Sequence, residues 1–278
     1  MTTKNGYADL HVHTNASDST FGPDEVILNA KLVGLSAVGI TDHDTVDSLD
    51  RALLLGKEAG VEVIPGIELS AEEGQAEIHI LGYFINHKDP VFAATLKMLR
   101  ESRLERAKEI IRKLKGQNVN IELEDVLKLT ESYTSVGRLH IARALKDAKH
   151  VSTIGDAFRR YIGQNGPAYV GKHKMSPREV IRMIKAAGGA AVLAHPVVLN
   201  NDELVKSMIP MGLDGIEVYH TEHNTAAVER YKAMAQANGL AMTGGSDCHG
   251  MSKNKMLLGT ILIPYEYVEQ LRLRAGAR

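Results

Sequence analysis

Several residue types are scarce in this sequence of 278 residues, which has one cysteine, Cys248, no tryptophan and four phenylalanines. A single cysteine excludes an internal disulfide and argues against a structural zinc site built from thiolates. We therefore expect a reducing, cytoplasmic location. The chain has no apolar run of membrane-spanning length and no visible signal peptide, so we expect no membrane partner.

The sequence also has no excess of either charge: it contains 33 Lys and Arg and 34 Asp and Glu residues, for a formal net charge of -1. This balance predicts no DNA-binding surface, although a local site for anions stays open. With 44% hydrophobic residues, the chain can build one large α/β domain or two smaller ones. The sequence does not predict the oligomeric state.

Histidine, in contrast, is plentiful, with twelve residues, and two of them lie close together near the start as His11 and His13. If residues 7–14 form a strand, both imidazoles project to one side while Leu10 and Val12 pack on the other. Two neighbouring imidazoles suggest a metal site. A pair of this kind also occurs by chance, so the hypothesis needs further ligands elsewhere in the chain.

The apolar pattern alternates between short strands and helices in both terminal parts of the chain. After the opening strand, we expect strands at 37–40, 61–64, 77–84, 190–194, 215–219 and 240–243. Helices are expected at about 23–34, 48–59, 177–187, 202–211 and 225–238. This rhythm predicts an α/β fold, a distorted (β/α)7 barrel of parallel strands.

The rhythm breaks in the middle of the chain, where the spacing of apolar residues is helical. We expect helices at about 91–114, 123–129, 137–147 and 154–161. A connection of this length without secondary structure is improbable. The sequence therefore predicts a barrel domain of residues 1–97 and 171–278, with a helical insertion (cap) domain at 98–170. The basic and acidic residues on the first of these helices predict a solvated face with ion pairs.

Polar residues follow the predicted strands in a regular way. The C-terminal ends of parallel barrel strands lie at one face, where chemistry collects. Any one of the polar residues at these strand ends could equally be a loop residue whose hydrogen bonds are made within the protein, but together they predict a metal site. Nine candidate ligands stand in or just after strands or in the loop after the first strand: His11, His13, Asp18, His43, Glu68, His79, His195, Asp247 and His249.

Nine ligands exceed the needs of one ion, so we expect two to three divalent metal ions. Manganese is our first choice, and iron or zinc would accept the same ligands. Clustered ions lower the pKa of a bound water to about 7 and hold phosphate oxygens during in-line displacement. This chemistry favours hydrolysis of a phosphate ester. Cys248 lies between two candidates, but strand-like alternation turns its thiol away from them.

Six motifs resemble those of the PHP (polymerase and histidinol phosphatase) family: residues 9–14, 41–44, 65–68, 79, 194–196 and 245–249. The resemblance covers about 7–84 and 188–250, and it implies a trinuclear metal site in a distorted seven-stranded barrel. It also implies which residues share an ion. The implied sets are His11, His13, Glu68 and Asp247; Glu68, His79 and His195; and Asp18, His43 and His249.

No position of the motif set is missing, which argues against a degenerate, noncatalytic copy. Asp9 and Asp42 either orient imidazoles or serve a plain structural role.

The insertion resembles that of family members acting on nucleoside 3',5'-bisphosphates, including relatives that trim RNA from its 5' end. Residues 134–143 predict a helix with a hydroxyl cap, and its N-terminus would bind phosphate with help from arginine. Arg138 and Arg143 do not share a helical face, and Arg138 in the first turn is the better candidate. Further candidates for holding phosphate are Ser135, Lys172 and His223, and the catalytic candidates are His223 and Asp247.

The sequence thus predicts a metal-dependent phosphoesterase that removes the 3'-phosphate of nucleoside 3',5'-bisphosphates, such as pAp, with short 5'-phosphorylated RNA as a further substrate. A first alternative is a histidinol-phosphate phosphatase or another phosphatase of small phosphomonoesters. A second alternative is a metal-binding regulatory module without catalysis. The sequence does not decide between mononucleotide and oligonucleotide.

Overall fold

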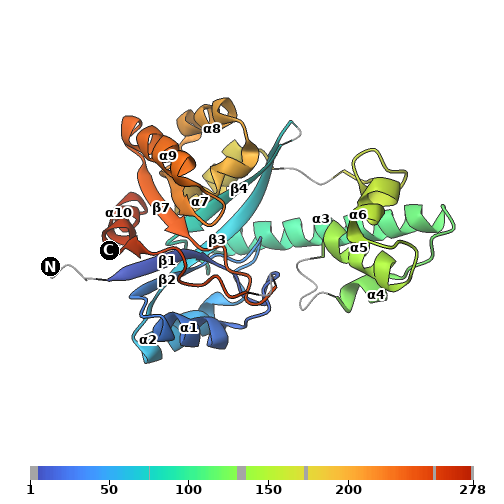
Figure 1. Cartoon of the computed structure of the whole chain (residues 1–278), viewed down its shortest axis with the longest axis horizontal. Coiled ribbons are helices and arrows are strands. Elements are labelled where there is room, and N and C mark those ends of the chain that lie inside the picture. Colours follow the sequence, from blue (N-terminus) through green and yellow to red (C-terminus); the bar gives the residue numbers. More distant parts are fainter. Residues whose placement is uncertain (1–5, 75, 130–135, 172–174, 253–254, 277–278) are drawn as a thin grey trace. The chain divides into compact units, whose positions relative to one another are not determined.

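The computed structural model describes residues 6–74, 76–129, 136–171, 175–252 and 255–276. The chain divides into two compact units, residues 1–93 with 174–278, and residues 94–173. We call them the barrel unit and the helical unit. The long helix α3 (Pro90–Lys115) begins in the first and continues through the second (Figure 1).

The barrel unit is built on one eight-stranded sheet with the order β7-β6-β5-β4-β3-β2-β1-β8. Its strands are β1 (Tyr7–Val12), β2 (Ala37–Ile40), β3 (Glu62–Glu73), β4 (Ala76–Tyr83), β5 (Ala190–Leu193), β6 (Gly215–His220), β7 (Ala241–Gly245) and β8 (Ile263–Pro264). The predicted α/β barrel class is confirmed.

The barrel nearly closes where β1 meets the end of β7. A parallel bridge joins Val12 to Cys248, and the His13 N–H donates to the Cys248 carbonyl at 3.0 Å. A Cβ on Gly245 would lie 2.3 Å from the His11 backbone nitrogen, so only glycine permits this approach. The closure brings the loop after β7 against the histidine strand β1.

The expectation that all strands run parallel is wrong at β4. This strand is antiparallel to both β3 and β5, whereas the pairs β1–β2, β2–β3, β5–β6 and β6–β7 are parallel. The reason is the length of β3, which extends to Glu73 and turns at Gly74, with φ of 61°, directly into β4. Strands joined by so short a turn pair antiparallel. His79 still comes beside Ser70, on the same face as Glu68.

Six helices pack around the sheet in the described part of the barrel unit (Figure 1). They are α1 (Pro23–Leu32), α2 (Leu49–Ala59), α7 (Pro177–Ala186), α8 (Asp202–Met208), α9 (Thr225–Ala237) and α10 (Glu266–Arg274). The start of α7 follows from its sequence, because the Ser176 side chain caps the helix by accepting from the Glu179 N–H. The element α10 was not predicted, yet its Val268 and Leu271 belong to the same buried cluster as Leu10 and Tyr83.

The helical unit has an apolar core of its own. Ile110 and Leu114 of α3 pack with Val126, Ile141 and Leu145, all at most 1% exposed. The unit also contains α4 (Leu123–Leu127), α5 (Arg138–Asp147), α6 (Ile154–Ala157) and the π-turn η1 (Phe158–Ile162).

The predicted solvated face of α3 is confirmed by exposed ion pairs, such as Lys108–Glu105 and Arg112–Glu109, each at 2.6 Å. Among the described residues of the whole chain, no helix has both the length and the apolar character needed to cross a membrane.

Candidate metal centre

Glu68 is the centre of the site. It is fully buried in β3, and its two oxygens contact five imidazoles. Oε2 lies 3.2 Å from His11 Nε2, 3.3 Å from His13 Nε2 and 3.2 Å from His43 Nδ1. Oε1 lies 2.8 Å from His79 Nδ1 and 3.0 Å from His195 Nε2. Four separate segments therefore deliver five histidines to one carboxylate, since His11 and His13 are neighbours at β1.

Asp247 and Asp18 extend the cluster on either side of His13. Asp247 Oδ1 lies 3.2 Å from His13 Nε2 and 3.5 Å from both His11 Nε2 and His249 Nδ1. Asp18 Oδ1 lies 3.2 Å from His249 Nε2, and its Oδ2 lies 3.9 Å from His43 Nε2. The Asp18 side chain is 39% exposed whereas His13 is fully buried, so this end of the cluster meets solvent. The structure thus brings all nine predicted ligands together.

The donor set fits divalent metal ions. Four groups of described residues hold their candidate ligand atoms within 4.8 Å of one another. They are His11, His13, Glu68 and Asp247; His13, Asp18, His43 and His249; His43, Glu68 and His79; and His11, Glu217 and His220. Both ring nitrogens of His13 and Nδ1 of His79 are buried and have no hydrogen-bond partner in the described part of the chain. Unpaired buried polar atoms are costly, and a metal bond would satisfy them.

The charges of the cluster also favour cations. Burial raises the pKa of Glu68, but the imidazoles of His43 and His11 outweigh it and hold the pKa well below its usual range. Burial lowers the pKa of His13, but the negative carboxylates of Asp247 and Glu68, 3.2 and 3.3 Å from its Nε2, raise it to about 10. Without metal, the carboxylates thus keep protons on His13 and His79, whereas burial lowers the pKa of His43 to about 3. A metal ion binds the same nitrogens and displaces those protons.

Two backbone positions in the cluster are strained. His195 has a φ of 25° and Asp247 a φ of 52°, both in the left-handed region that side chains other than glycine rarely adopt. Such strain persists where the surrounding structure overdetermines it, and it concentrates at functional sites.

Asp9 and Asp42 do not orient imidazoles, so the structural reading is the correct one. Asp9 accepts the N–H groups of Ser246 and Gly259, each at 2.9 Å. Asp42 accepts the backbone N–H and the hydroxyl of Thr14 at 2.6 and 2.7 Å. Both carboxylates hold the loops that carry metal-ligand candidates, because loop N–H groups need acceptors where water is excluded.

Glu217 and His220 on β6 also belong to the site, although they are not among the predicted ligands. Glu217 Oε1 accepts from His11 Nδ1 at 3.0 Å, and His220 Nε2 lies 3.9 Å from Asp247 Oδ2. The available signal was an acid inside an apolar strand whose last residue is a histidine. This signal is ambiguous, because alternation with Ile216 and Val218 is also typical of a strand with one solvated face.

His223 stands three residues beyond the end of β6. Its Nδ1–H donates to the Val218 carbonyl at 2.8 Å, and its ring lies 5.5 Å from that of His220. Nε2 is buried and has no hydrogen-bond partner among the described residues. Burial lowers the pKa of His223, so the free ring is neutral at pH 7, with its lone pair on Nε2.

The remaining candidates all belong to the helical unit, residues 94–173. Ser135 and Lys172 lie outside the described residues. The predicted hydroxyl cap is wrong, because α5 begins at Arg138 and its N-cap is Gly137, whose N–H donates to His140 Nδ1 at 3.2 Å. Arg143 is exposed.

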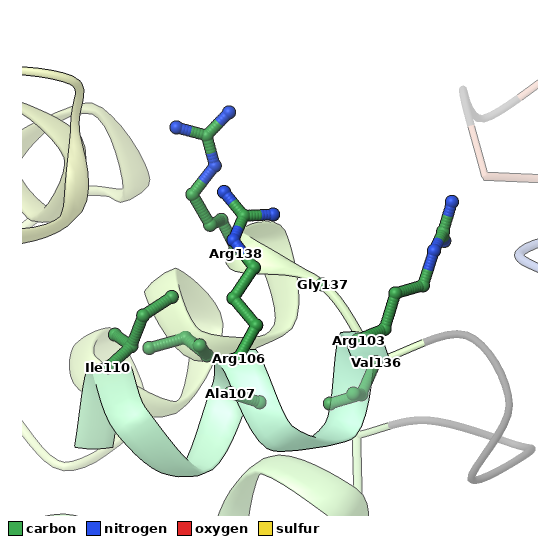
Figure 2. A pocket seen from close by; sticks show the side chains of 8 residues that line it. Arg103, Arg106, Ala107, Ile110, Val136, Gly137 and Arg138 are labelled. Atoms are coloured by element: carbon green, nitrogen blue, oxygen red, sulfur yellow. The ribbon is translucent and has the colours of Figure 1, made fainter. Parts of the chain in front are cut away.

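Arg138 lines a pocket within the helical unit together with Arg103 and Arg106. Figure 2 shows these three side chains extending to the same side, away from the helix backbone. The Arg138 guanidinium lies 5.7 Å from the ring centre of Phe158 and 5.8 Å from that of Tyr169. Aromatic faces at this distance attract and hold a guanidinium.

A nearly closed α/β barrel with carboxylates and imidazoles clustered around one buried glutamate defines the class of metal-dependent phosphoesterases. Comparison with known proteins narrows the class. The model of the family described as PHP domain matches residues 9–168, more than half of the chain, and the chain belongs to this family.

Relatives of known name cover most of the chain. A 3',5'-nucleoside bisphosphate phosphatase of Chromobacterium violaceum is 31% identical over 246 residues, covering 87% of this chain and 86% of the relative. A 5'-3' exoribonuclease of Haemophilus influenzae is 31% identical over 269 residues, covering 93% and 97%. A phosphoribosyl 1,2-cyclic phosphate 1,2-diphosphodiesterase of Eggerthella lenta is 32% identical over 251 residues, covering 87% and 94%.

Solved structures agree with the fold. A protein of Bifidobacterium adolescentis, described as an inferred metal-dependent phosphoesterase, is 33% identical with a TM-score of 0.82 over 96% of both chains. An amidohydrolase of Chromobacterium violaceum, solved with sulfate and no metal, is 29% identical with a TM-score of 0.79 over 95% of this chain and 96% of that one.

Proposed function

We propose that this chain hydrolyses the 3'-phosphate of nucleoside 3',5'-bisphosphates in a metal-dependent reaction. The observation that carries the proposal is the convergence of five imidazoles on the buried Glu68 carboxylate, flanked by Asp247 and Asp18. The proposal is supported by the relative named as a 3',5'-nucleoside bisphosphate phosphatase, which matches 87% of this chain. The single cysteine supports a cytoplasmic location.

We assign the nine clustered residues to two or three ions, with Glu68 shared between two of them. His11, His13, Glu68 and Asp247 would hold one ion, and Glu68, His79 and His195 a second, while Asp18, His43 and His249 would hold a third. Bound divalent ions supply a water of lowered pKa and neutralise charge on the reacting phosphate. Imidazole with carboxylate suits manganese, iron and zinc, and manganese is our first choice among them.

His223 is the proposed donor to the departing ribose oxygen. Its Nδ1–H bond to the Val218 carbonyl fixes the ring and leaves Nε2 for the substrate. In the free protein burial keeps this ring neutral by lowering its pKa. The negative charge of a bound phosphate stabilises the imidazolium and raises that pKa again. Nε2 then carries the proton that the leaving oxygen needs.

The helical unit supplies the recognition of the second phosphate in this proposal. It is basic, with 16 Lys and Arg against nine Asp and Glu between residues 94 and 173. The pocket of Arg103, Arg106 and Arg138 gathers planar donors that match phosphate oxygens. Arg138 in the first turn of α5 combines its own charge with the positive end of the helix. Arg143, Ser135 and Lys172 remain proposed further contacts.

Short 5'-phosphorylated RNA is a second candidate substrate. The net positive charge of the helical unit favours a polyanion, because released counterions drive such binding. Relatives named as 5'-3' exoribonucleases in Haemophilus influenzae and Escherichia coli match 93% and 87% of the chain.

The test is a substrate panel for the purified chain loaded with Mn(II). Adenosine 3',5'-bisphosphate, AMP, histidinol phosphate and a short 5'-phosphorylated RNA are assayed for phosphate or nucleotide release. We expect the bisphosphate to react with a kcat/KM at least about tenfold above that of AMP. Equal rates on AMP and the bisphosphate would contradict recognition of a second phosphate. A preference for histidinol phosphate would make the chain a phosphomonoesterase of small metabolites, and no turnover of any substrate would favour a regulatory module.

A further inference from the structure

Glu217 is a buried acid in β6 that the proposed metal sets do not use. Its side chain has no exposed surface, and it points to the face of β6 opposite to its apolar neighbours Ile216 and Val218. Each of its oxygens accepts one hydrogen bond, and both donors belong to proposed metal ligands. Oε1 accepts from His11 Nδ1 at 3.0 Å, and Oε2 accepts from the backbone N–H of His195 at 2.7 Å.

We propose that Glu217 is a positioning residue for two ligands of the metal centre, through the ring of His11 and the backbone of His195. This inference rests on the proposed metal-dependent function. Glu217 touches neither substrate nor ion in this account. It determines which nitrogen of His11 is free to bind metal and where the His195 ring is placed.

The effect on His11 follows from tautomer chemistry. A neutral imidazole carries one proton, and a carboxylate can only accept. When an ion binds Nε2 in place of its hydrogen bond to Glu68, Glu217 holds that proton on Nδ1. The lone pair is then on Nε2, the nitrogen that lies 3.2 Å from Glu68 Oε2 and 3.5 Å from Asp247 Oδ1. Partners of this kind orient metal-binding histidines and increase their basicity.

The effect on His195 follows from its backbone. A φ of 25° is strained for a residue with a side chain, and the conformation needs a fixed partner. The Glu217 Oε2 bond at 2.7 Å supplies one at the strained residue itself. This conformation directs His195 Nε2 to Glu68 Oε1 at 3.0 Å, where the second proposed ion would bind. One carboxylate thereby supports a ligand in each of two metal sets.

A rival interpretation makes His11, Glu217 and His220 a further metal site, because their ligand atoms lie within 4.8 Å of one another. The hydrogen bonds oppose it. His220 Nδ1 accepts the backbone N–H of Glu222 at 3.1 Å, so the single proton of the neutral ring is on Nε2, the nitrogen that faces the cluster. To bind metal through Nε2, the neutral ring would have to move its proton to Nδ1, where the Glu222 N–H already donates. His11 Nδ1 is likewise occupied by its own proton.

The first experiment measures zinc affinity and zinc content by equilibrium dialysis of the full chain, for the wild type, E217Q, D214N and H220Q. In E217Q, an amide NH2 replaces one acceptor, so either His11 or the His195 N–H loses its partner. We expect a 10- to 100-fold loss of metal affinity. D214N is the matched control, because Asp214 is also a buried acid that accepts a β5 backbone N–H, from Ala191 at 2.9 Å. It should keep wild-type affinity.

Unchanged zinc affinity in E217Q would overturn the proposal. H220Q distinguishes the two interpretations. If Glu217 only positions ligands, the number of bound ions stays unchanged, whereas loss of one ion per chain would establish a metal site at His11, Glu217 and His220. These readouts do not depend on which phosphate ester is hydrolysed, so failure of the substrate proposal is seen separately in the substrate panel.

A second measurement needs no variant and therefore no assumption that E217Q folds. Nitrogen-15 NMR of histidine-labelled wild-type protein loaded with zinc reports which ring nitrogen of His11 carries the proton. Protonated Nδ1 with metal-bound Nε2 is the expected result. Protonated Nε2 on His11 would contradict the role of Glu217.

Discussion

The two units differ in where their charge lies. The barrel unit has 25 Asp and Glu against 17 Lys and Arg, and its functional groups are buried around Glu68. The helical unit has 16 Lys and Arg against nine Asp and Glu. Three of its arginines line a pocket that also borders its apolar core. The acidic unit suits cations and catalysis, whereas the basic unit suits the anionic substrate. The difference implies that chemistry and recognition can be damaged separately.

The largest effect is expected from a change in the barrel unit, D247N. Asp247 contacts His11, His13 and His249, and the amide removes the negative charge that would bind an ion. We expect kcat to fall at least about 10³-fold, equivalent to about 4 kcal/mol. The measurement is turnover at saturating Mn(II), with circular dichroism to confirm folding. The control D50N alters an exposed acid and should retain full activity; substantial activity in D247N would remove Asp247 from catalysis.

A smaller and more selective effect is expected from R138M in the helical unit. Loss of a charged donor to phosphate costs about 1.5–3 kcal/mol, so kcat/KM for the bisphosphate should fall about 10- to 100-fold. Hydrolysis of AMP should stay the same, because only one phosphate is bound there. K146M is the control, because it removes another exposed positive charge from α5 that has no proposed contact with the substrate. Equal losses on both substrates would show that Arg138 does not read the second phosphate.

Much of the metal centre in the barrel unit was predictable from the sequence, because apolar runs that end in polar residues indicate the ends of strands. His43 and Asp247 follow this rule, which depends on local pattern and general barrel geometry. Glu68 does not, because β3 continues past it to Glu73. The direction of β4 did not follow, since it depends on β3 continuing beyond Pro65 into a hairpin with β4. The role of Glu217 was also not predictable, because it depends on contacts with His11 across 206 positions of sequence.

The smallest of these effects is a release of protons when the barrel unit takes up metal. In the metal-free protein the pKa of His13 is raised to about 10 and that of His79 to about 9, so both rings hold protons at pH 7.5. Metal binding requires the neutral rings, and its affinity should therefore increase with pH in this range. Titration of weakly buffered apoprotein with Zn(II) and a pH indicator should show acidification. An unchanged pH would contradict the predicted protonation of the cluster.

The central claim is that one buried carboxylate with its surrounding imidazoles and acids holds a group of metal ions. The most direct test is the metal content of the purified full chain, measured by plasma mass spectrometry after gel filtration, for the wild type and H11A. We predict two to three transition-metal ions per wild-type chain and a clear loss in H11A. One ion or fewer per chain in the wild type, after growth and reloading with Mn(II), Fe(II) or Zn(II), would contradict the claim.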